Sequence, residues 1–380
     1  MRKAVTTVSA RAETPAATTG PVKIVGTGLL GTSIGLALQA AGVEVWLADS
    51  SPIALALARD MGAGQPYDGG EPALVVVAAP PDVTAALVLR ELDQHPAAIV
   101  TDVASVKALI AQEVVARTGP EQAPRYVGSH PMAGRERSGA AAADVDLFVG
   151  RPWVIVPTPQ SSATARTVIR NLALDVSAVP LTLDGDSHDQ AVALVSHVPQ
   201  IAASLVAARL TEASPEALSL AGQGIRDVTR IAASAPQLWA AILAGNAGRV
   251  AEILRLMRAD IDKLLVALDR AANAGPTAPG ALSDLVDTIA RGNQGVARIP
   301  GKHGGAPRRY TTVIVVVPDE PGRLGQLFSA VGDIGVNIED LHLEHSAGAP
   351  VGMAHLSVLP AAAAQLESGL TERGWRVVAE

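Results

Sequence analysis

A glycine-rich segment near the start of the chain constrains its fold more than any other feature. Gly26, Gly28 and Gly31 follow the β-branched run Val22–Val25 and open an apolar stretch that begins at Leu29. The spacing G-x-G-x-x-G between a predicted strand and a predicted helix is typical of a dinucleotide-binding turn. Gly26 permits the tight turn, Gly28 leaves room for a pyrophosphate at the backbone, and Gly31 lets the helix pack close to the strand.

The start of this helix and the end of the next strand complete the predicted cofactor site. A helix N-terminus offers unpaired N–H groups and a positive dipole end, so we expect Leu29 and Leu30 to lie at the phosphates. Asp49 follows the predicted strand Val43–Ala48. A carboxylate there binds the two hydroxyls of an adenosine ribose and repels a 2′-phosphate, which predicts NAD rather than NADP. The alternative is a tight turn without a ligand.

Composition and charge narrow the class of protein. The chain has 380 residues, 48% hydrophobic and 18% charged, which indicates roughly two to three packed domains. The net charge of −7 gives no basic face for nucleic acid. The absence of cysteine excludes disulfides, cysteine-ligated zinc and thiolate catalysis, and it fits a cytoplasmic protein. Residues 1–20 lack the apolar run of a signal peptide and are predicted to form a disordered tail.

The pattern of apolar residues predicts an α/β fold of three domains. Strand-like and helix-like runs alternate over residues 21–183, which indicates a Rossmann-type, doubly wound parallel sheet with helices on both faces. Residues 184–290 have helical periodicity, and we expect an all-helical domain that forms a subunit interface and one wall of the active site. Residues 291–309 are predicted to be a flexible linker. Residues 310–380 have the order βαββαβ, which predicts a small ferredoxin-like domain.

Three helices are expected in the second domain. The first carries the apolar stretch Ala191–Leu210, which polar residues such as His197 interrupt, so we favour a buried helix over a membrane span. Pro199 should kink this helix, and Ser234 is the expected N-cap of the third. The three predicted ranges are Asp186–Arg209, Pro215–Ala232 and Pro236–Leu264.

Residues that follow predicted strands are the candidates for chemistry. In an open α/β sheet, ligands lie outside the carboxyl ends of the strands, which is where Ser105 and Lys107 follow the strand Ala98–Thr101. His130 follows another strand-like run. Histidine titrates near neutrality, so His130 can accept a substrate hydroxyl proton as a hydride leaves. The alternatives are a helix N-cap made by Asp102 or Ser105, and a structural histidine.

Four segments, in this order, resemble the prephenate/arogenate dehydrogenase family of tyrosine biosynthesis. They are the glycine loop, Asp102–Lys107, the Ser-His-Pro-Met-Ala-Gly run Ser129–Gly134, and the Ile-Arg-Asp-Val-Thr-Arg-Ile-Ala run Ile225–Ala232. The resemblance extends over residues 21–290. It implies an enzyme that oxidises the ring hydroxyl of its substrate with NAD(P), while carbon dioxide leaves and the ring becomes aromatic.

The resemblance also implies roles at the reacting centre. His130 would bond the 4-hydroxyl of the substrate and accept its proton, and Ser105 would orient that hydroxyl and the cofactor. Arg230 would hold a substrate carboxylate, which a guanidinium binds bidentately. The alternative for Arg230 is an ion pair with Asp227 at i, i+3 on a helix surface.

Further positions would shape the substrate pocket. The resemblance places His197 and Trp239 in its wall and Glu136 at its gate. Two departures bear on the choice of substrate: Gln200 stands where the family often has a second histidine, and Arg135 stands where a small polar residue is common. No metal site is expected, because the histidines lack ligand spacing with carboxylates and this chemistry needs no Lewis acid.

The C-terminal residues 310–380 resemble an ACT domain through Pro318–Gly325 and Ile334–Ile338. Such domains bind a small amino acid at a dimer interface and report it to an attached enzyme. The resemblance implies feedback inhibition by an aromatic amino acid, with Gly335 and Asn337 as effector-binding residues. The alternative is a purely structural dimerisation module.

We therefore expect an NAD-dependent dehydrogenase that forms a homodimer or a higher homo-oligomer. We expect it to act on a small molecule, prephenate, without nucleic acid or membrane partners. Arogenate stays open as the substrate, because it differs from prephenate only by an amino-acid in place of a keto-acid side chain. A different hydroxyacid or imine oxidoreductase would leave the Ser129–Gly134 segment unexplained. A regulatory sensor of nucleotides and amino acids would leave His130, Ser105 and Arg230 without a role.

Overall fold

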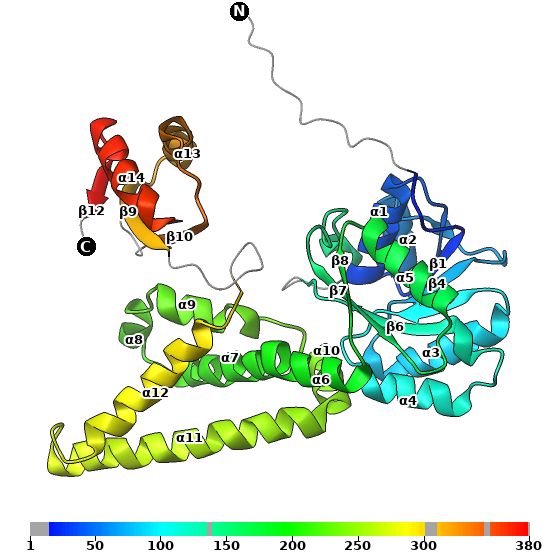
Figure 1. Ribbon diagram of the computed structural model, residues 1–380, viewed down its shortest axis with the longest axis horizontal. Coiled ribbons are helices and arrows are strands. Elements are labelled where there is room, and N and C mark those ends of the chain that lie inside the picture. The colour runs from blue at the N-terminus through cyan, green and yellow to red at the C-terminus, as the bar shows by residue number, and fades with distance from the viewer. Residues whose placement is uncertain (1–14, 135–138, 301–309, 346–349, 379–380) are drawn as a thin grey trace, which may run out of the picture. The chain divides into compact units, whose positions relative to one another are not determined.

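The computed structural model describes residues 15–134, 139–300, 310–345 and 350–378 (Figure 1). These residues form two compact units. The first contains the residues up to Ala208 together with Ile231–Arg255, and the second contains Arg209–Arg230 and the residues from Leu256 onward. Ala17 and Thr18 already belong to the folded part, because their N–H groups donate to the Asp175 carboxylate at 3.2 and 2.7 Å. The last residues of the expected disordered tail, which the structure describes, are therefore ordered by these hydrogen bonds.

An eight-stranded sheet forms the centre of the first unit, in the order β3-β2-β1-β4-β5-β6-β7-β8. Strands β1 to β6 are parallel, as predicted, but β7 runs antiparallel to β6, and β8 is parallel to β7. The prediction of a uniformly parallel sheet is therefore wrong at this edge. A parallel neighbour needs a crossover of a dozen or more residues, usually a helix; the described residues between β6 and β7 form only a short 3-10 turn, Ala140–Ala142. The strands are β1 Val22–Val25, β2 Val45–Ala48, β3 Gln65–Pro66, β4 Leu74–Val77, β5 Ile99–Asp102, β6 Tyr126–Pro131, β7 Pro152–Pro157 and β8 Val179–Thr182.

Helices cover both faces of this sheet (Figure 1). One apolar core joins the sheet to α1, α2 and α5, through buried side chains such as Leu38 and Ile169. The other joins it to α3, α4 and α10, through side chains such as Val88 and Ile110. The strand β4 is wholly apolar and buried, as a strand covered on both faces must be. The five helices that flank the sheet in sequence are α1 Leu29–Ala40, α2 Pro52–Asp60, α3 Pro81–Gln94, α4 Ala108–Arg117 and α5 Ala163–Asp175.

The register of the parallel strands brings their carboxyl ends to one edge. Val25 pairs with Val77, Val77 with Asp102, and Asp102 with Gly128. His130 therefore lies two residues beyond this row, at the same edge as the glycine turn that follows β1. The strand order reverses between β1 and β4, and such a switch point is where open α/β sheets bind their ligands.

The first predicted helix of the helical segment is confirmed as a long run with a local disturbance. It consists of α6 (Gly185–Val192), a π-helical turn (Ala193–His197) and α7 (Val198–Arg209). Pro199 lacks an N–H and crowds the preceding turn, and a π turn relieves that conflict without ending the helix. Among the described residues, Gly185–Glu212 is the one run long and apolar enough to cross a membrane by length and composition. Its buried polar side chains, His188, Asp189 and His197, favour a helix of the fold.

The other helices of this segment are more broken than predicted. The expected helix Pro215–Ala232 is two short ones, α8 (Pro215–Ser219) and α9 (Gln223–Thr229), because Gly222 starts a new helix. The expected helix Pro236–Leu264 is divided at Asn246 into α10 (Pro236–Gly245) and α11 (Ala247–Ala274).

Two local predictions in the same region are wrong. Ala235, not Ser234, is the N-cap of α10, and the Ser234 hydroxyl donates to the Ile231 carbonyl at 2.7 Å instead. Helix α12 (Ala281–Val296) continues into the segment that was expected to be a linker. Its apolar positions repeat at a helical spacing, which outweighs the glycines near its end.

The C-terminal residues confirm the predicted order βαββαβ. They form β9 (Thr311–Pro318), α13 (Arg323–Ile334), β10 (Asp340–His345), β11 (Val351–Val358), α14 (Pro360–Glu372) and β12 (Arg376–Val378). The four strands make an antiparallel sheet in the order β10-β11-β9-β12. Strand β9 alternates buried and half-buried residues, and its inner face packs on Leu327 of α13 and Leu366 of α14.

Candidate active site

The turn after β1 requires glycine at two of its three glycine positions. Gly26 has a φ of +102°, and a methyl group there would lie 2.3 Å from the Ala78 carbonyl oxygen. A methyl group at Gly31 would lie 1.9 Å from the Gly26 carbonyl oxygen. Apart from Gly28 itself and its chain neighbours, no atom lies within 4 Å of the corresponding position at Gly28. The turn is therefore closed on the sheet side and open above Gly28, as a cradle for a phosphate must be.

Asp49 braces this turn. Its Oδ2 accepts hydrogen bonds from the Thr27 N–H at 2.6 Å and from the Thr27 hydroxyl at 2.8 Å, and its Oδ1 accepts from the Ser51 N–H at 2.7 Å. Helix α1 begins directly after the N-cap Gly28, which provides no capping side chain. The N–H groups of Leu29 and Leu30 thus belong to an uncapped first turn, the part of a helix that attracts anions.

A chain of three side chains ends at the candidate base. His130 Nδ1 lies 2.9 Å from His188 Nε2, and His188 Nδ1 lies 2.8 Å from Asp189 Oδ1. His188 and Asp189 are 1% and 0% exposed, whereas His130 at the end of β6 is 9% exposed. Among the described residues, His130 Nε2 has no hydrogen-bond partner. The one ring nitrogen that can face a substrate is therefore Nε2.

Asp189 is held from several sides. Its carboxylate accepts from the backbone N–H groups of Lys107 and Ala108, at 2.8 and 2.9 Å, and so caps α4. Its carbonyl oxygen accepts from Asn246 Nδ2 at 2.7 Å. Burial opposes ionisation of the Asp189 carboxyl, but the hydrogen bonds from His188 and from the two N–H groups outweigh it and lower its pKa.

His130 is uncharged at neutral pH. Burial is the main cause that holds the pKa of His130 well below its usual value, and the neighbouring ionisable side chains of His188, Lys107 and His197 act in the same direction. A neutral imidazole with an unprotonated nitrogen is the form that accepts a proton.

The side chains after β5 differ in how deeply they are buried. Lys107 is 1% exposed, and its ammonium contacts Asp102 Oδ1, so this lysine is the buried ion-pair partner of that carboxylate. The hydroxyl of Tyr126 donates to Asp102 Oδ2 at 2.8 Å. Burial lowers the pKa of Lys107, while the Asp102 carboxylate opposes that shift. Ser105 is half-buried in the loop before α4, and the cap of that helix comes from Asp189 rather than from Asp102 or Ser105.

The structure brings His197 and Trp239 together. Their ring centroids are 6.1 Å apart in an edge-to-face arrangement, and His197 Nδ1 lies 3.3 Å from Asn246 Nδ2. Burial lowers the pKa of His197 to about 4, although the Asp189 carboxylate opposes this shift. Gln200 lies one turn further along α7 and its Nε2 is 3.4 Å from the Ser204 hydroxyl.

The remaining candidates belong to the second unit or lie outside the described residues. Arg230 is exposed at the start of the 3-10 turn Arg230–Ala232, in the second unit. Asp227, its suggested ion-pair partner, accepts a hydrogen bond from Gln223 at 2.8 Å. Glu136 and Arg135 lie outside the described residues.

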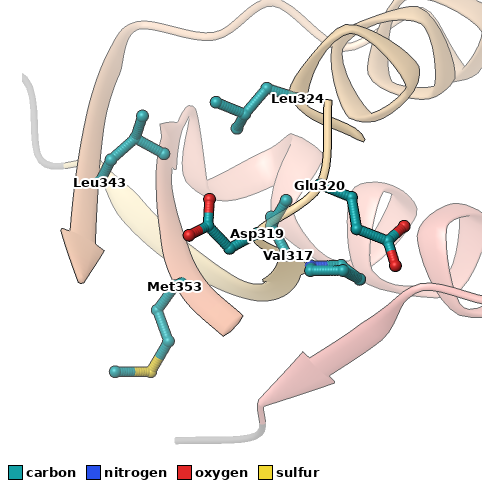
Figure 2. Close-up of a pocket in the computed structure, with 8 residues that line it drawn as sticks. Val317, Asp319, Glu320, Leu324, Leu343 and Met353 are labelled. Carbon is teal, nitrogen blue, oxygen red and sulfur yellow. The ribbon is translucent and has the colours of Figure 1, made fainter. Parts of the chain in front are cut away.

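In the C-terminal βαββαβ segment, the two expected effector residues have local contacts. Gly335 ends α13 with a φ of +78°, and Asn337 Nδ2 donates to Glu339 Oε1 at 2.8 Å. A separate small cavity of about 50 Å³ lies at the end of β9, and neither residue lines it. Figure 2 shows Leu324 and Leu343 pointing toward each other across this cavity.

The His188–Asp189 pair was not predicted from the sequence. Nothing in the local sequence pattern links His188 to His130, 58 residues earlier. The only local signal was a histidine next to a carboxylate on a helix that faces the sheet.

Comparison with known proteins identifies the family of this chain. A sequence profile of the prephenate dehydrogenase nucleotide-binding domain matches residues 34–181, and one of the prephenate dehydrogenase dimerization domain matches residues 184–275. A putative prephenate dehydrogenase from Corynebacterium glutamicum has a similar structure, with a TM-score of 0.62 and 29% identity, over 74% of this chain and 90% of that one.

Curated relatives extend over most of the chain. The probable prephenate dehydrogenase NovF of Streptomyces niveus is 37% identical over 93% of this chain and 98% of its own length. The prephenate dehydrogenase of Bacillus subtilis is 27% identical over 85% of this chain and 87% of its own. The resemblance noted in the sequence is confirmed, and the chain belongs to the prephenate dehydrogenase family.

Proposed function

We propose that this protein is an NAD-dependent oxidoreductase that converts prephenate to 4-hydroxyphenylpyruvate and carbon dioxide. The observation that carries the proposal is the position of His130. It is a neutral imidazole at the carboxyl edge of the sheet, three strands from an open dinucleotide turn, with only its Nε2 available to a ligand. The names of the relatives support prephenate as the substrate.

The residues present fit an NAD molecule. The pyrophosphate would lie over Gly28 and the first turn of α1, where no side chain intrudes. The Asp49 carboxylate at the end of β2 would bind the ribose hydroxyls and disfavour a 2′-phosphate. When bound, NAD accepts a hydride from the ring carbon that bears the substrate hydroxyl.

His130 handles the proton of that hydroxyl. As the hydride leaves, the O–H bond breaks, its electrons form the C=O bond, and the proton passes to His130 Nε2. Loss of carbon dioxide then returns an electron pair to the ring and makes it aromatic. The ring oxygen becomes a phenol by taking the proton back from His130, so the whole conversion neither releases nor consumes a proton.

Other candidates would position the substrate. Ser105, in the loop after β5, would orient the hydroxyl, and His197 with Trp239 would form part of the pocket wall. Arg230 would bind a substrate carboxylate and Glu136 would gate the pocket. The second carboxylate of prephenate makes a fixed cation valuable, because a guanidinium pairs with a carboxylate through two hydrogen bonds.

Arogenate is the alternative substrate. A relative named cyclohexadienyl dehydrogenase, from Zymomonas mobilis, is 28% identical over 65% of this chain. The test is to measure NADH absorbance with purified protein and either prephenate or arogenate, with NAD and then with NADP. A rate with prephenate and NAD supports the proposal. Turnover with arogenate and none with prephenate would make arogenate the substrate.

A matched variant separates an enzyme from a nucleotide sensor. His130→Gln keeps a polar side chain but cannot act as a base, so kcat should fall about 10²-fold or more while NAD binding is unchanged. Binding of NAD without turnover by the unmodified protein would favour a sensor. Normal turnover by the variant would remove His130 from the mechanism.

We further propose that the C-terminal unit is an ACT domain that inhibits the enzyme when it binds an aromatic amino acid, most simply tyrosine. Its βαββαβ order and antiparallel sheet support this assignment. Regulation requires the amino acid to favour one of two states of the enzyme. Inhibition by tyrosine that Asn337→Ala weakens, with kcat unchanged, would support it; equal inhibition of both proteins would locate the tyrosine elsewhere.

We also propose a homodimer formed through the helical segment. The match to a dimerization domain supports this, as do exposed apolar side chains on the helix run Gly185–Glu212: Leu194 is 59% exposed, Val195 63% and Leu205 61%. Light scattering after size exclusion should give twice the 38.7 kDa chain mass. A Leu205→Glu variant should shift the protein toward monomer.

A further inference from the structure

We propose that His188 and Asp189 are positioning residues that fix the tautomer of His130. They hold hydrogen on its Nδ1 and so leave Nε2 ready to accept the proton of the substrate hydroxyl. This inference deepens the proposed function and rests on it for its catalytic consequence. The tautomer itself is a property of the free protein and can be measured without a substrate.

The contacts of the Asp189 carboxylate fix the first hydrogen position. Both of its carboxylate oxygens accept backbone N–H groups, Oδ1 from Lys107 and Oδ2 from Ala108. A protonated carboxyl would direct an O–H at one of these donors, so the ionised form is the one that fits. Nδ1 of His188 lies 2.8 Å from Oδ1 and must therefore carry a hydrogen.

The position of the hydrogen on His188 in turn fixes the position of the hydrogen on His130. A neutral His188 with hydrogen on Nδ1 has a bare Nε2, which can only accept a hydrogen bond. That nitrogen lies 2.9 Å from His130 Nδ1, so His130 must donate from Nδ1. A neutral His130 then has its lone pair on Nε2, the nitrogen without a partner among the described residues. Each step follows from the number of hydrogens that the ring or carboxylate can hold.

The pair is rigid enough to impose this choice. His188 and Asp189 are consecutive residues of α6, and both are almost fully buried. Asn246 anchors the Asp189 carbonyl, and the N-terminus of α4 anchors its carboxylate. The two imidazole rings meet edge to face with centroids 5.1 Å apart. Rotation of His130 would break its hydrogen bond inside a buried site.

The arrangement also favours the protonated intermediate. When His130 takes the substrate proton, its positive charge lies two hydrogen bonds from the Asp189 carboxylate. The other ionisable groups around His130 are His188, Lys107 and His197, all of which oppose a positive charge there. Lys107 is itself paired with Asp102. Asp189 is thus the carboxylate whose hydrogen-bonded path leads to His130.

The direct test is histidine-selective ¹⁵N labelling and a long-range proton–nitrogen NMR spectrum of the full chain at neutral pH. The His130 signals are assigned by their loss in His130→Gln. We expect hydrogen on Nδ1 and none on Nε2 in the unmodified protein. Hydrogen on Nε2 would overturn the proposal, and so would a doubly protonated His188, which would reverse the direction of both hydrogen bonds.

A pair of substitutions tests the effect on turnover. His188→Leu removes the acceptor for His130, whereas His188→Gln can restore one through its amide oxygen. We expect kcat to fall about 10²-fold in His188→Leu, with KM nearly unchanged, and to recover at least 10-fold in His188→Gln. Equal kcat values for the two variants would reduce His188 to a packing residue.

A control and a second variant separate positioning from folding. Asp189→Asn should alter the His130 tautomer signals and lower kcat, because an amide places a donor where one carboxylate oxygen stood. His95→Gln replaces another buried histidine of the same unit, 3% exposed, and should leave kcat and the His130 signals unchanged. If the unmodified protein lacks prephenate turnover but has the expected tautomer, the proposed function fails while the positioning role stands.

Discussion

The low pKa of His197 makes the stability of the first unit depend on pH. Its ring is 1% exposed, and burial lowers its pKa from 6.5 to about 4. The unfolded chain binds a proton at His197 below about pH 6.5, whereas the folded chain excludes it until about pH 4. The unfolded state therefore binds more protons in this window, and the stability falls as the pH falls.

The size of the effect follows from the shift. A difference of about 2.5 pKa units corresponds to about 3 kcal/mol once both forms are protonated, and to about 2 kcal/mol at pH 5. The low pKa of His130 acts in the same direction. In His197→Gln the side chain no longer titrates, so the variant should lose about 2 kcal/mol less than the unmodified protein between pH 7.5 and pH 5.

Urea unfolding followed by tryptophan fluorescence measures this difference. Three of the four tryptophans, Trp46, Trp153 and Trp239, belong to the first unit, so a Trp375→Phe background makes the signal specific to that unit. His342→Gln, in the second unit, is the control and should keep the full pH dependence. Equal losses of stability in His197→Gln and in the unmodified protein would refute the linkage between this buried ring and pH.

Three further substitutions test other parts of the molecule. Lys107→Met should destabilise the first unit by about 3–5 kcal/mol in urea unfolding, because it leaves the Asp102 carboxylate buried without its cation, and adding Asp102→Asn should recover part of that loss. Gly31→Ala should weaken NAD binding at least 10-fold by calorimetry, since its methyl group would lie 1.9 Å from the Gly26 carbonyl oxygen and push α1 away; unchanged affinity would mean that the turn is not the cradle. Arg230→Ala should raise the KM for prephenate strongly with a smaller effect on kcat, and an unchanged KM in steady-state assays would reject its carboxylate role.

Much of the fold was predictable because its signals are local. The β-branched runs of β1 and β4, the glycines after β1 and the βαββαβ order after residue 310 each depend on neighbours in sequence. The breaks at Gly222 and Asn246 were missed, because apolar helical periodicity continues across both. The direction of β7 was missed because no short-range pattern encodes which way a strand enters a sheet.

The residues of the candidate site also differ in whether a local sequence signal revealed them. The glycine turn, Asp49 and the identity of His130 as a base were visible from residue types next to predicted strands. The burial of Lys107 against Asp102 was not visible, because a lysine after a strand reads as exposed until the packing around it is known.

The sequence by itself determined the cofactor turn, the alternation that builds the sheet and the presence of an imidazole at a strand end, since each requires only contacts within a few residues. Tertiary structure alone decided that α6 carries His188 and Asp189 to His130, and that Asp189 caps α4 at the same time. The physical reason is that a hydrogen bond forms only when donor and acceptor lie within about 3 Å, and packing between elements far apart in the chain sets that distance.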